Sequence, residues 1–238
     1  MTKHSNFPSN VRLLSTKRYL ASAAGVGNYD NFNLATHTGD NLDVVLHNRQ
    51  LLARHFNLPN MPKWLNQTHS NICLEASAKG CEGDAIITKN SKTVCAIMTA
   101  DCLPIFATNT QGLQVGVAHA GWQGILNGVI ESFVAAFDES ELLVHFGPAI
   151  SAKNLEVGSE VFEQFVDKDQ KLSAALTQKG EKYHLDIYQA ARIILGNLGV
   201  NSITGGDECT FAQSQDYFSY RRDGAKSGRM AHLIWIDI

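Results

Sequence analysis

Two neighbouring stretches decide how this chain is interpreted: TADCLPIF at residues 99–106 and GVAHAGWQG at residues 116–124. Each lies beside short apolar runs of the kind that form buried β-strands, and each carries one chemically reactive side chain. These side chains are Cys102 and His119. Because strand ends deliver side chains to a common edge of a sheet, we expect Cys102 and His119 to face one site.

The segments around these stretches alternate between short β-branched runs and amphipathic helices. The spacing predicts strands at residues 85–88, 94–98, 104–107, 115–118 and 142–146, and a closing strand at 230–238. It predicts helices at 42–57, 157–166 and 187–198, and one helix after His119 whose apolar residues run from Ile125 to Phe137. Asp186 is placed to cap the 187–198 helix, and Gly199 to end it. The pattern favours a mixed-sheet α+β or α/β fold.

Length and composition fit one folded unit. The chain has 238 residues, of which 44% are hydrophobic, and it contains no repeat and no proline-rich linker. We therefore expect a single domain spanning residues 1–238. The net charge of −3 and the absence of a basic run argue against nucleic-acid partners and against binding to anionic membranes.

Location and redox state follow from what the sequence contains. No apolar stretch approaches the roughly 20 residues that cross a bilayer, and the N-terminal residues lack the apolar region of a signal peptide. We expect a cytoplasmic protein with a small-molecule substrate. Its five cysteines are an odd number and include no CxxC pair, which predicts free thiols and argues against a four-ligand structural zinc site.

A third candidate joins Cys102 and His119. His69 lies in the polar segment WLNQTHSN. Two imidazoles and a thiolate suit zinc, and three protein ligands leave a fourth position for water or substrate, as in catalytic sites. Taken singly, a cysteine such as Cys102 is more often a buried core thiol, a histidine such as His119 is more often structural, and His69 fits a surface loop as well.

Two further features point to anionic or ring-shaped ligands. Gly121 and Gly124 bracket the start of the predicted helix, where free N–H groups can hold an anion, although these glycines also allow close helix packing. Near the C-terminus, YFSYRRDGAKSGR (217–229) gathers cations and aromatic rings. Arginine forks pair with phosphate or carboxylate, whereas such a loop can also be a solvated turn.

Together the motifs resemble a known family. They are N-L-x-x-H-x-G-D (33–40), N-R (48–49), Q-x-H (67–69), T-A-D-C-x-P (99–104), A-H-A-G-W-x-G (118–124), G-P-x-I (147–150), C-T (209–210) and S-Y-R-R-D-G…G-R (219–229). This set is similar to the laccase-domain family, whose members are also described as purine nucleoside phosphorylases, polyphenol oxidases or peptidoglycan editing factors. The resemblance runs from about residue 18 to the C-terminus.

The resemblance implies a single α+β domain of layered mixed β-sheets with outer helices. It implies that His69, Cys102 and His119 are both metal ligands and catalytic residues, with zinc or copper as the metal. Asn33, Arg49 and Arg222 lie in the matching motifs, and we predict that they contact substrate, the arginines through phosphate or ribose oxygens. Gln123 departs from the family pattern, in which this position often carries arginine.

The implied activity is zinc-dependent phosphorolysis of adenosine, inosine and methylthioadenosine, with adenosine deamination alongside. Two alternatives use the same residues. In a cysteine-dependent amidase that edits muropeptide precursors, Cys102 would be the nucleophile and His119 its base. A copper polyphenol oxidase is the other, although the chain's nine histidines include no H-x-H pair of the kind multicopper sites use.

Overall fold

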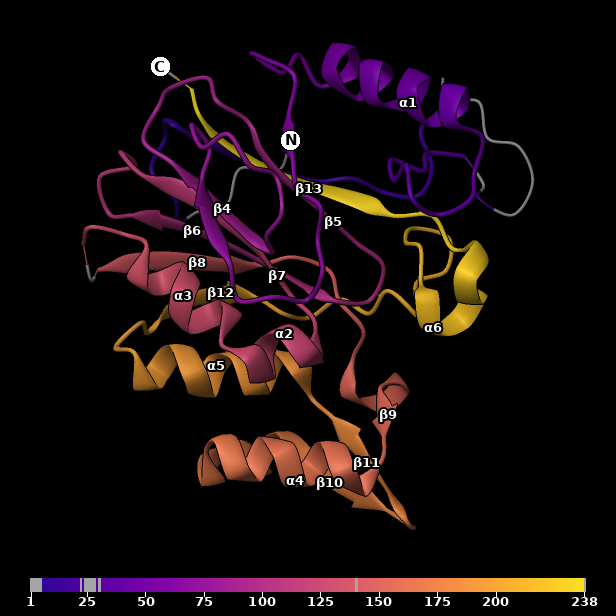
Figure 1. Cartoon of the computed structure of the whole chain (residues 1–238), viewed down its shortest axis with the longest axis vertical. Coiled ribbons are helices and arrows are strands. Elements are labelled where there is room, and N and C mark those ends of the chain that lie inside the picture. The colour runs from indigo at the N-terminus through magenta and orange to yellow at the C-terminus, as the bar shows by residue number, and fades with distance from the viewer. Residues whose placement is uncertain (1–5, 22, 24–28, 30, 140, 238) are drawn as a thin grey trace.

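Two mixed β-sheets packed face to face form the centre of the structure, and helices cover their outer faces (Figure 1). The computed structural model describes residues 6–21, 23, 29, 31–139 and 141–237. This layering is the α+β arrangement of mixed sheets with outer helices that the family resemblance implies.

The smaller of the two central sheets has four strands in the order β1 (Val11–Ser15), β13 (Met230–Ile236), β5 (Cys95–Thr99) and β2 (Lys63–Trp64). β13 runs antiparallel to both β1 and β5, whereas β2 runs parallel to β5. Helix α1 (Leu42–His55) lies against the outer face of this sheet (Figure 1).

The larger central sheet has six strands, one of which contains His119 and another of which begins directly after Cys102. In order across the sheet they are β12 (Ser202–Gly205), β8 (Leu142–Phe146), β6 (Leu103–Asn109), β7 (Val115–Ala120), β4 (Ala85–Thr88) and β3 (Cys73–Glu75). The four inner strands pair antiparallel, and the two edge strands pair parallel to their neighbours.

Helices on the far side of the six-stranded sheet complete the layers. They are α2 (Trp122–Asn127), α3 (Val129–Ala135) and α5 (Ile187–Asn197). Below them in Figure 1 lie α4 (Ser159–Lys168) and a three-stranded antiparallel sheet of β10 (Leu176–Lys179), β11 (Lys182–Leu185) and β9 (Glu156–Val157). The short elements are α6 (Tyr220–Asp223) and the 3-10 turns Ala152–Asn154, Gln170–Ala175 and Gly224–Lys226.

Alternation along the strands sorts apolar side chains into separate layers. On β5, Ile97 faces the six-stranded sheet, whereas Ala96 and Met98 face the α1 side. The layer between the sheets also buries Phe106 and Ile234. Each such side chain stabilises the fold by about 1.5–3 kcal/mol when removed from water. The packed sheets therefore give the strand ends a fixed frame.

Most predicted elements are confirmed. The strands at 85–88 and 142–146 match β4 and β8, and Asp186 caps α5 through its side chain as predicted. The closing strand ends at Ile236, and residue 238 of the predicted range lies outside the described residues. No helix in the described ranges is long and apolar enough to span a bilayer.

The prediction of a single helix after His119 is wrong. Gly128 adopts a φ of 93° and divides the segment into α2 and α3, although the apolar spacing continues across the break. Ile125 and Val129 are both buried, so both pieces still pack on the six-stranded sheet. Periodicity records which face is buried, and it does not register a one-residue change in backbone direction.

Candidate metal and substrate site

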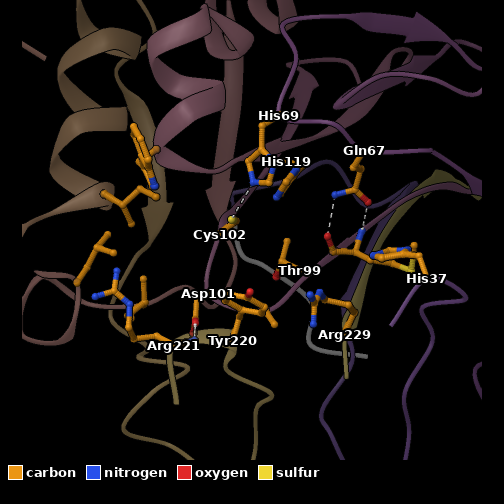
Figure 2. A pocket seen from close by; sticks show the side chains of 16 residues that line it. His37, Gln67, His69, Thr99, Asp101, Cys102, His119, Tyr220, Arg221 and Arg229 are labelled. Carbon is orange, nitrogen blue, oxygen red and sulfur yellow. Dashed lines mark hydrogen bonds between the residues drawn. The ribbon is translucent and has the colours of Figure 1, made fainter. Parts of the chain in front are cut away.

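The three predicted ligands converge from three separate segments. His69 lies in the loop before β3, Cys102 in the turn between β5 and β6, and His119 near the end of β7. One ligand atom from each residue lies within 4.8 Å of the other two, and Cys102 Sγ is 3.7 Å from His69 Nε2. Figure 2 shows the three side chains meeting at one wall of a cavity. His119 belongs to the strand itself rather than to the turn after it.

Asp84 is a carboxylate that sequence reasoning missed. It is fully buried, and its Oδ1 lies 2.7 Å from His119 Nδ1. The same carboxylate accepts hydrogen bonds from the backbone N–H groups of Thr68, His69 and Ser70, and from the Ser70 hydroxyl. Asp84 thus joins the loop that carries one histidine to the ring of the other. A carboxylate on the far nitrogen of a histidine fixes the ring and leaves Nε2 for a metal.

These bonds decide the ionisation of Asp84. Burial alone would raise the pKa of this carboxyl, but the bonds from His119 and Ser70 outweigh burial and lower the pKa to about 2. Asp84 directly precedes β4, a position where an aspartate reads as an ordinary turn residue. Its partners lie 14 to 35 residues away in sequence, so local pattern gives no sign of them.

The turn that presents Cys102 has a built-in support. Asp101 adopts a φ of 92°, which is unusual for a residue other than glycine. Its buried carboxylate accepts hydrogen bonds from the Thr210 hydroxyl at 2.6 Å, the Ser219 hydroxyl at 3.0 Å and the Arg221 backbone N–H at 2.6 Å. These C-terminal contacts hold the backbone in the conformation that turns Cys102 toward the histidines.

Gly121 is required by the close approach of the ligands. A Cβ atom at this position would lie 2.7 Å from His69 Cδ2 and 2.9 Å from Cys102 Sγ, closer than real contacts allow. Its φ of −70° is open to any residue, so the constraint is space and not backbone conformation. The glycine therefore leaves room for the two ligands beside the start of α2.

The charges around Cys102 favour its thiolate, the form that binds metals. Burial raises the pKa of Cys102, but the opposing effect of His119 and His69 is larger and lowers it below the ordinary range. Burial lowers the pKa of His119, and Cys102 together with Asp84 raises it above the usual value. The thiolate, not the thiol, binds metals and acts as a nucleophile. A thiolate and two imidazoles in reach of one point fit a zinc-type ion.

The ligand group opens onto a cavity of about 380 Å³. Its floor and walls include the apolar side chains of Met98, Trp122, Ile150, Leu155 and Ile187. Its polar lining includes His37, Gln67, Thr99, Tyr220, Arg221 and Arg229 (Figure 2). An apolar pocket with a few convergent polar groups is the usual form of a small-molecule site.

Two cations belong to this lining. The Arg229 guanidinium lies 5.5 Å from the centroid of the Tyr220 ring, and its Nη1 donates to the Ser227 and Gly228 carbonyl groups. Arg221 donates from Nη1 to the Glu156 carbonyl. Both come from the predicted cluster at residues 217–229. They give the cavity positive charge away from the ligand group.

The three residues predicted to contact substrate do not line this cavity. Arg49 donates from Nε to the Leu34 carbonyl and stacks 4.3 Å from the centroid of Trp64. Arg222 donates to the backbone carbonyl groups of Thr210, Phe211 and Tyr217. Since these donors serve the protein's own carbonyl groups, direct substrate contact by either arginine stays a prediction without geometric support.

Asn33 is fully buried and connects two parts of the cavity wall. Its Oδ1 accepts from the Arg229 backbone N–H at 3.0 Å, and its Nδ2 donates to Thr38 Oγ1 at 3.0 Å and to Asp40 Oδ2 at 2.9 Å. Thr38 follows His37, a lining residue. Asn33 thus positions lining residues instead of contacting the cavity. Gln123, the departure from the family pattern, is exposed on α2 and does not line the cavity.

Comparison with known proteins gives the chain its relatives. A family profile described as multi-copper polyphenol oxidoreductase laccase matches residues 13–237. Purine nucleoside phosphorylase YfiH of Escherichia coli is 46% identical over 213 residues, covering 87% of each chain. A purine nucleoside phosphorylase of Haemophilus influenzae is 42% identical, covering 98% of this chain and 97% of that one.

Solved structures agree with the sequence matches. A Neisseria meningitidis protein superposes with a TM-score of 0.93 at 38% identity, covering 100% of this chain and 99% of that one. YlmD from Geobacillus stearothermophilus superposes with a TM-score of 0.88 at 24% identity, covering 99% and 94%, which shows a shared fold.

Proposed function

The chain belongs to the family described as multi-copper polyphenol oxidoreductase laccase, and from this premise we propose that it is a zinc-dependent purine nucleoside phosphorylase. We propose adenosine, inosine and methylthioadenosine as substrates, with adenosine deamination as a second activity. The curated relatives that match most of the chain at 46% and 42% identity carry the phosphorylase name. The family is one of enzymes that act on small molecules.

The observation that carries the proposal is one cavity with two kinds of polar wall. On one side His69, Cys102 and His119 bring three ligand atoms within 4.8 Å of one another. Away from them, Arg221 and Arg229 supply positive charge. Phosphorolysis needs an anion held near the sugar and stabilisation of the departing base, and this cavity offers groups for both.

We assign the residues as follows. His69, Cys102 and His119 hold the metal, which when bound supplies Lewis-acid chemistry at that wall. Arg229 and Arg221 hold phosphate or the polar part of the nucleoside through charge-assisted hydrogen bonds. Tyr220 and the apolar wall offer surface for the purine ring. We propose further that the protein is a single domain, that it works in the cytoplasm, and that it has no nucleic-acid or membrane partner.

The Asp84–His119–Cys102 arrangement favours a second candidate. A carboxylate that orients a histidine beside a low-pKa thiol is also how cysteine nucleophiles are activated, as an amidase acting on muropeptide precursors would need. A copper polyphenol oxidase gains less support, since the described residues hold one three-ligand group and laccase chemistry uses several copper ions.

One assay separates these candidates. Purified protein is supplied with adenosine, inosine or methylthioadenosine, with and without phosphate, and with muropeptide precursors in parallel, each with and without chelator. We expect phosphate-dependent release of base and ribose 1-phosphate that chelator abolishes and that His69→Ala lowers at least about 100-fold. Amide hydrolysis that survives chelator, with no phosphorolysis, contradicts the proposal and supports the amidase.

A further inference from the structure

A buried histidine links the cavity to a second cavity, which is lined in part by β1 and by His145 on β8. His232 Nε2 lies 2.8 Å from Thr99 Oγ1, and His232 Nδ1 lies 2.8 Å from Ser15 Oγ. Thr99 lines the cavity of the ligand group. Ser15 lines a separate cavity of about 360 Å³. The three side chains therefore make an unbroken hydrogen-bonded path from one cavity to the other.

Strand register places this path. Ser15 on β1 is the direct cross-strand partner of His232 on β13. His232 pairs with Ile97 on β5, and Thr99, two residues further on, has its side chain on the same face. Three adjacent strands thus contribute one polar side chain each. The rest of this face is apolar and includes Leu13 and Ile234, so a hydrophobic residue would suit the position of His232 equally well.

The imidazole is neutral, which gives the path a direction. His232 is fully buried, and burial, followed by the charge of His119, lowers its pKa to about 3. In a neutral ring one nitrogen donates and the other accepts. One of the two hydroxyl groups must therefore donate to His232 while the other accepts from it. Burying this ring costs free energy, and its two hydrogen bonds offset that cost.

The second cavity provides an exchange point with water. Its wall includes Lys17 and Asp216, whose side chains form an ion pair at 2.6 Å and are 58% and 37% exposed. Thr99, by contrast, is 2% exposed. In the view of Figure 2, Thr99 lies between the ligand group and Arg229. A proton that leaves Ser15 reaches solvent without crossing the substrate cavity.

We propose that Thr99, His232 and Ser15 form a proton relay between the two cavities, with Thr99 delivering the proton to the departing purine. The identity of the acceptor rests on the proposed phosphorolysis. Thr99 is the catalytic residue of the relay, because it faces the substrate cavity, and His232 and Ser15 are positioning residues that act through it.

The transfers balance as follows. The bond between C1′ and the purine nitrogen breaks with its electron pair going to the base, while a phosphate oxygen bonds to C1′. The base takes a proton from Thr99 Oγ1, Thr99 takes one from His232 Nε2, His232 Nδ1 takes one from Ser15, and Ser15 takes one from water in the second cavity. The proton that phosphate loses on forming the ester returns by the same route, which restores the Nε2–H ring.

Substitutions at the two ends of the path provide the kinetic test. Thr99→Val removes the hydroxyl at constant shape and should lower kcat at least tenfold, with KM within twofold of wild type. Thr99→Ser keeps a hydroxyl and should retain most of the wild-type kcat. Ser15→Ala should lower kcat severalfold, although Ser15 lies outside the substrate cavity. Thr108→Val is the matched control, because Thr108 is fully buried and its hydroxyl bonds to the Asn109 and Gln114 carbonyl groups, away from the path. Its kcat should be unchanged.

The ring itself provides a readout that does not need activity. Nitrogen-15 NMR at neutral pH, with His232→Gln to identify the resonances, should show a neutral His232 with the proton on Nε2. A proton on Nδ1, or a charged ring, overturns the relay. So does wild-type kcat in both Thr99→Val and Ser15→Ala. If wild-type protein with zinc releases no base, the proposed function fails, and the NMR result still decides whether the relay stands.

Discussion

The cavity has two walls that are built differently. His69, Cys102 and His119 come from separate segments and are held by Asp84, whose carboxylate binds both a ring nitrogen and a loop backbone. The arginine wall depends on the C-terminal segment, where Arg229 contacts Tyr220 and neighbouring carbonyl groups. The first wall is fixed by a fully buried carboxylate, whereas the guanidinium groups of the second are held by backbone carbonyl groups and, for Arg229, by the Tyr220 ring. We expect the first to tolerate substitution far less than the second.

The largest effect is expected from a substitution that fills the space beside the metal ligands. Gly121→Ala places a methyl group against His69 and Cys102, so the ligands must move apart. We expect phosphorolysis to fall about 100-fold, because misplacement by about 1 Å has effects of that order. The measurement is kcat/KM together with bound zinc per chain.

Gly124→Ala is the matched control. Its Cβ would meet its nearest neighbour at 3.5 Å, an ordinary contact, and the residue lies in the same helix, α2. Zinc content and activity should stay at wild-type levels. Equal effects of the two substitutions would show that the helix start, and not the space beside the ligands, matters.

Asp84→Asn tests the support behind the ligand wall. The substitution removes the charge that orients His119 while keeping the size of the side chain. Zinc affinity should fall about 10- to 100-fold, as when partners behind metal-binding histidines are changed elsewhere. Competition with a chromogenic chelator measures it, and an unchanged affinity would contradict the role given to Asp84.

The lowered pKa of Asp84 also makes the free energy of unfolding depend on pH. The folded pKa of Asp84 is lowered from 3.8 to about 2, so ionised Asp84 stabilises the folded state above pH 3.8. That contribution, about 2 kcal/mol, should be lost as pH falls from 3.8 through about 2. Denaturant unfolding of metal-free protein at several pH values should show the gap between wild type and Asp84→Asn closing over that window.

The arginine wall should show the smallest effect. Arg229→Met is expected to raise KM about tenfold, equivalent to about 1.4 kcal/mol of binding, with a smaller change in kcat. Arg222→Met should instead lower the melting temperature, because Arg222 holds three backbone carbonyl groups and does not line the cavity. A larger KM effect from Arg222 than from Arg229 would restore the prediction made from the sequence.

The two walls also differ in how far sequence predicts them. His69, Cys102 and His119 are residue types with few roles, and two of them lie beside readable strands, so pattern alone brings them together as candidates. Asp84 is not identified from the sequence, because its hydrogen-bond partners are distant along the chain and its own position resembles a turn. Arginine is a common residue, and the motifs do not show which guanidinium faces the cavity and which serves backbone carbonyl groups.

The fold follows the same rule. Strands such as β4 and β8 are predicted at their full length because apolar runs are local, and α5 is marked by its cap at Asp186. The break at Gly128 is missed because buried residues continue on both sides of it. The short strands β2 and β9, two residues each, pair only through tertiary contacts and leave no periodic pattern.

Alkylation of Cys102 tests the central claim, that the ligand wall holds a metal, most directly. Zinc-loaded protein is treated with iodoacetamide at neutral pH, with and without chelator, and modification of Cys102 is followed by peptide mass spectrometry. We expect Cys102 to resist modification until chelator is added, and then to react quickly because its pKa is low. Rapid alkylation of Cys102 in protein that retains one zinc per chain would contradict the account.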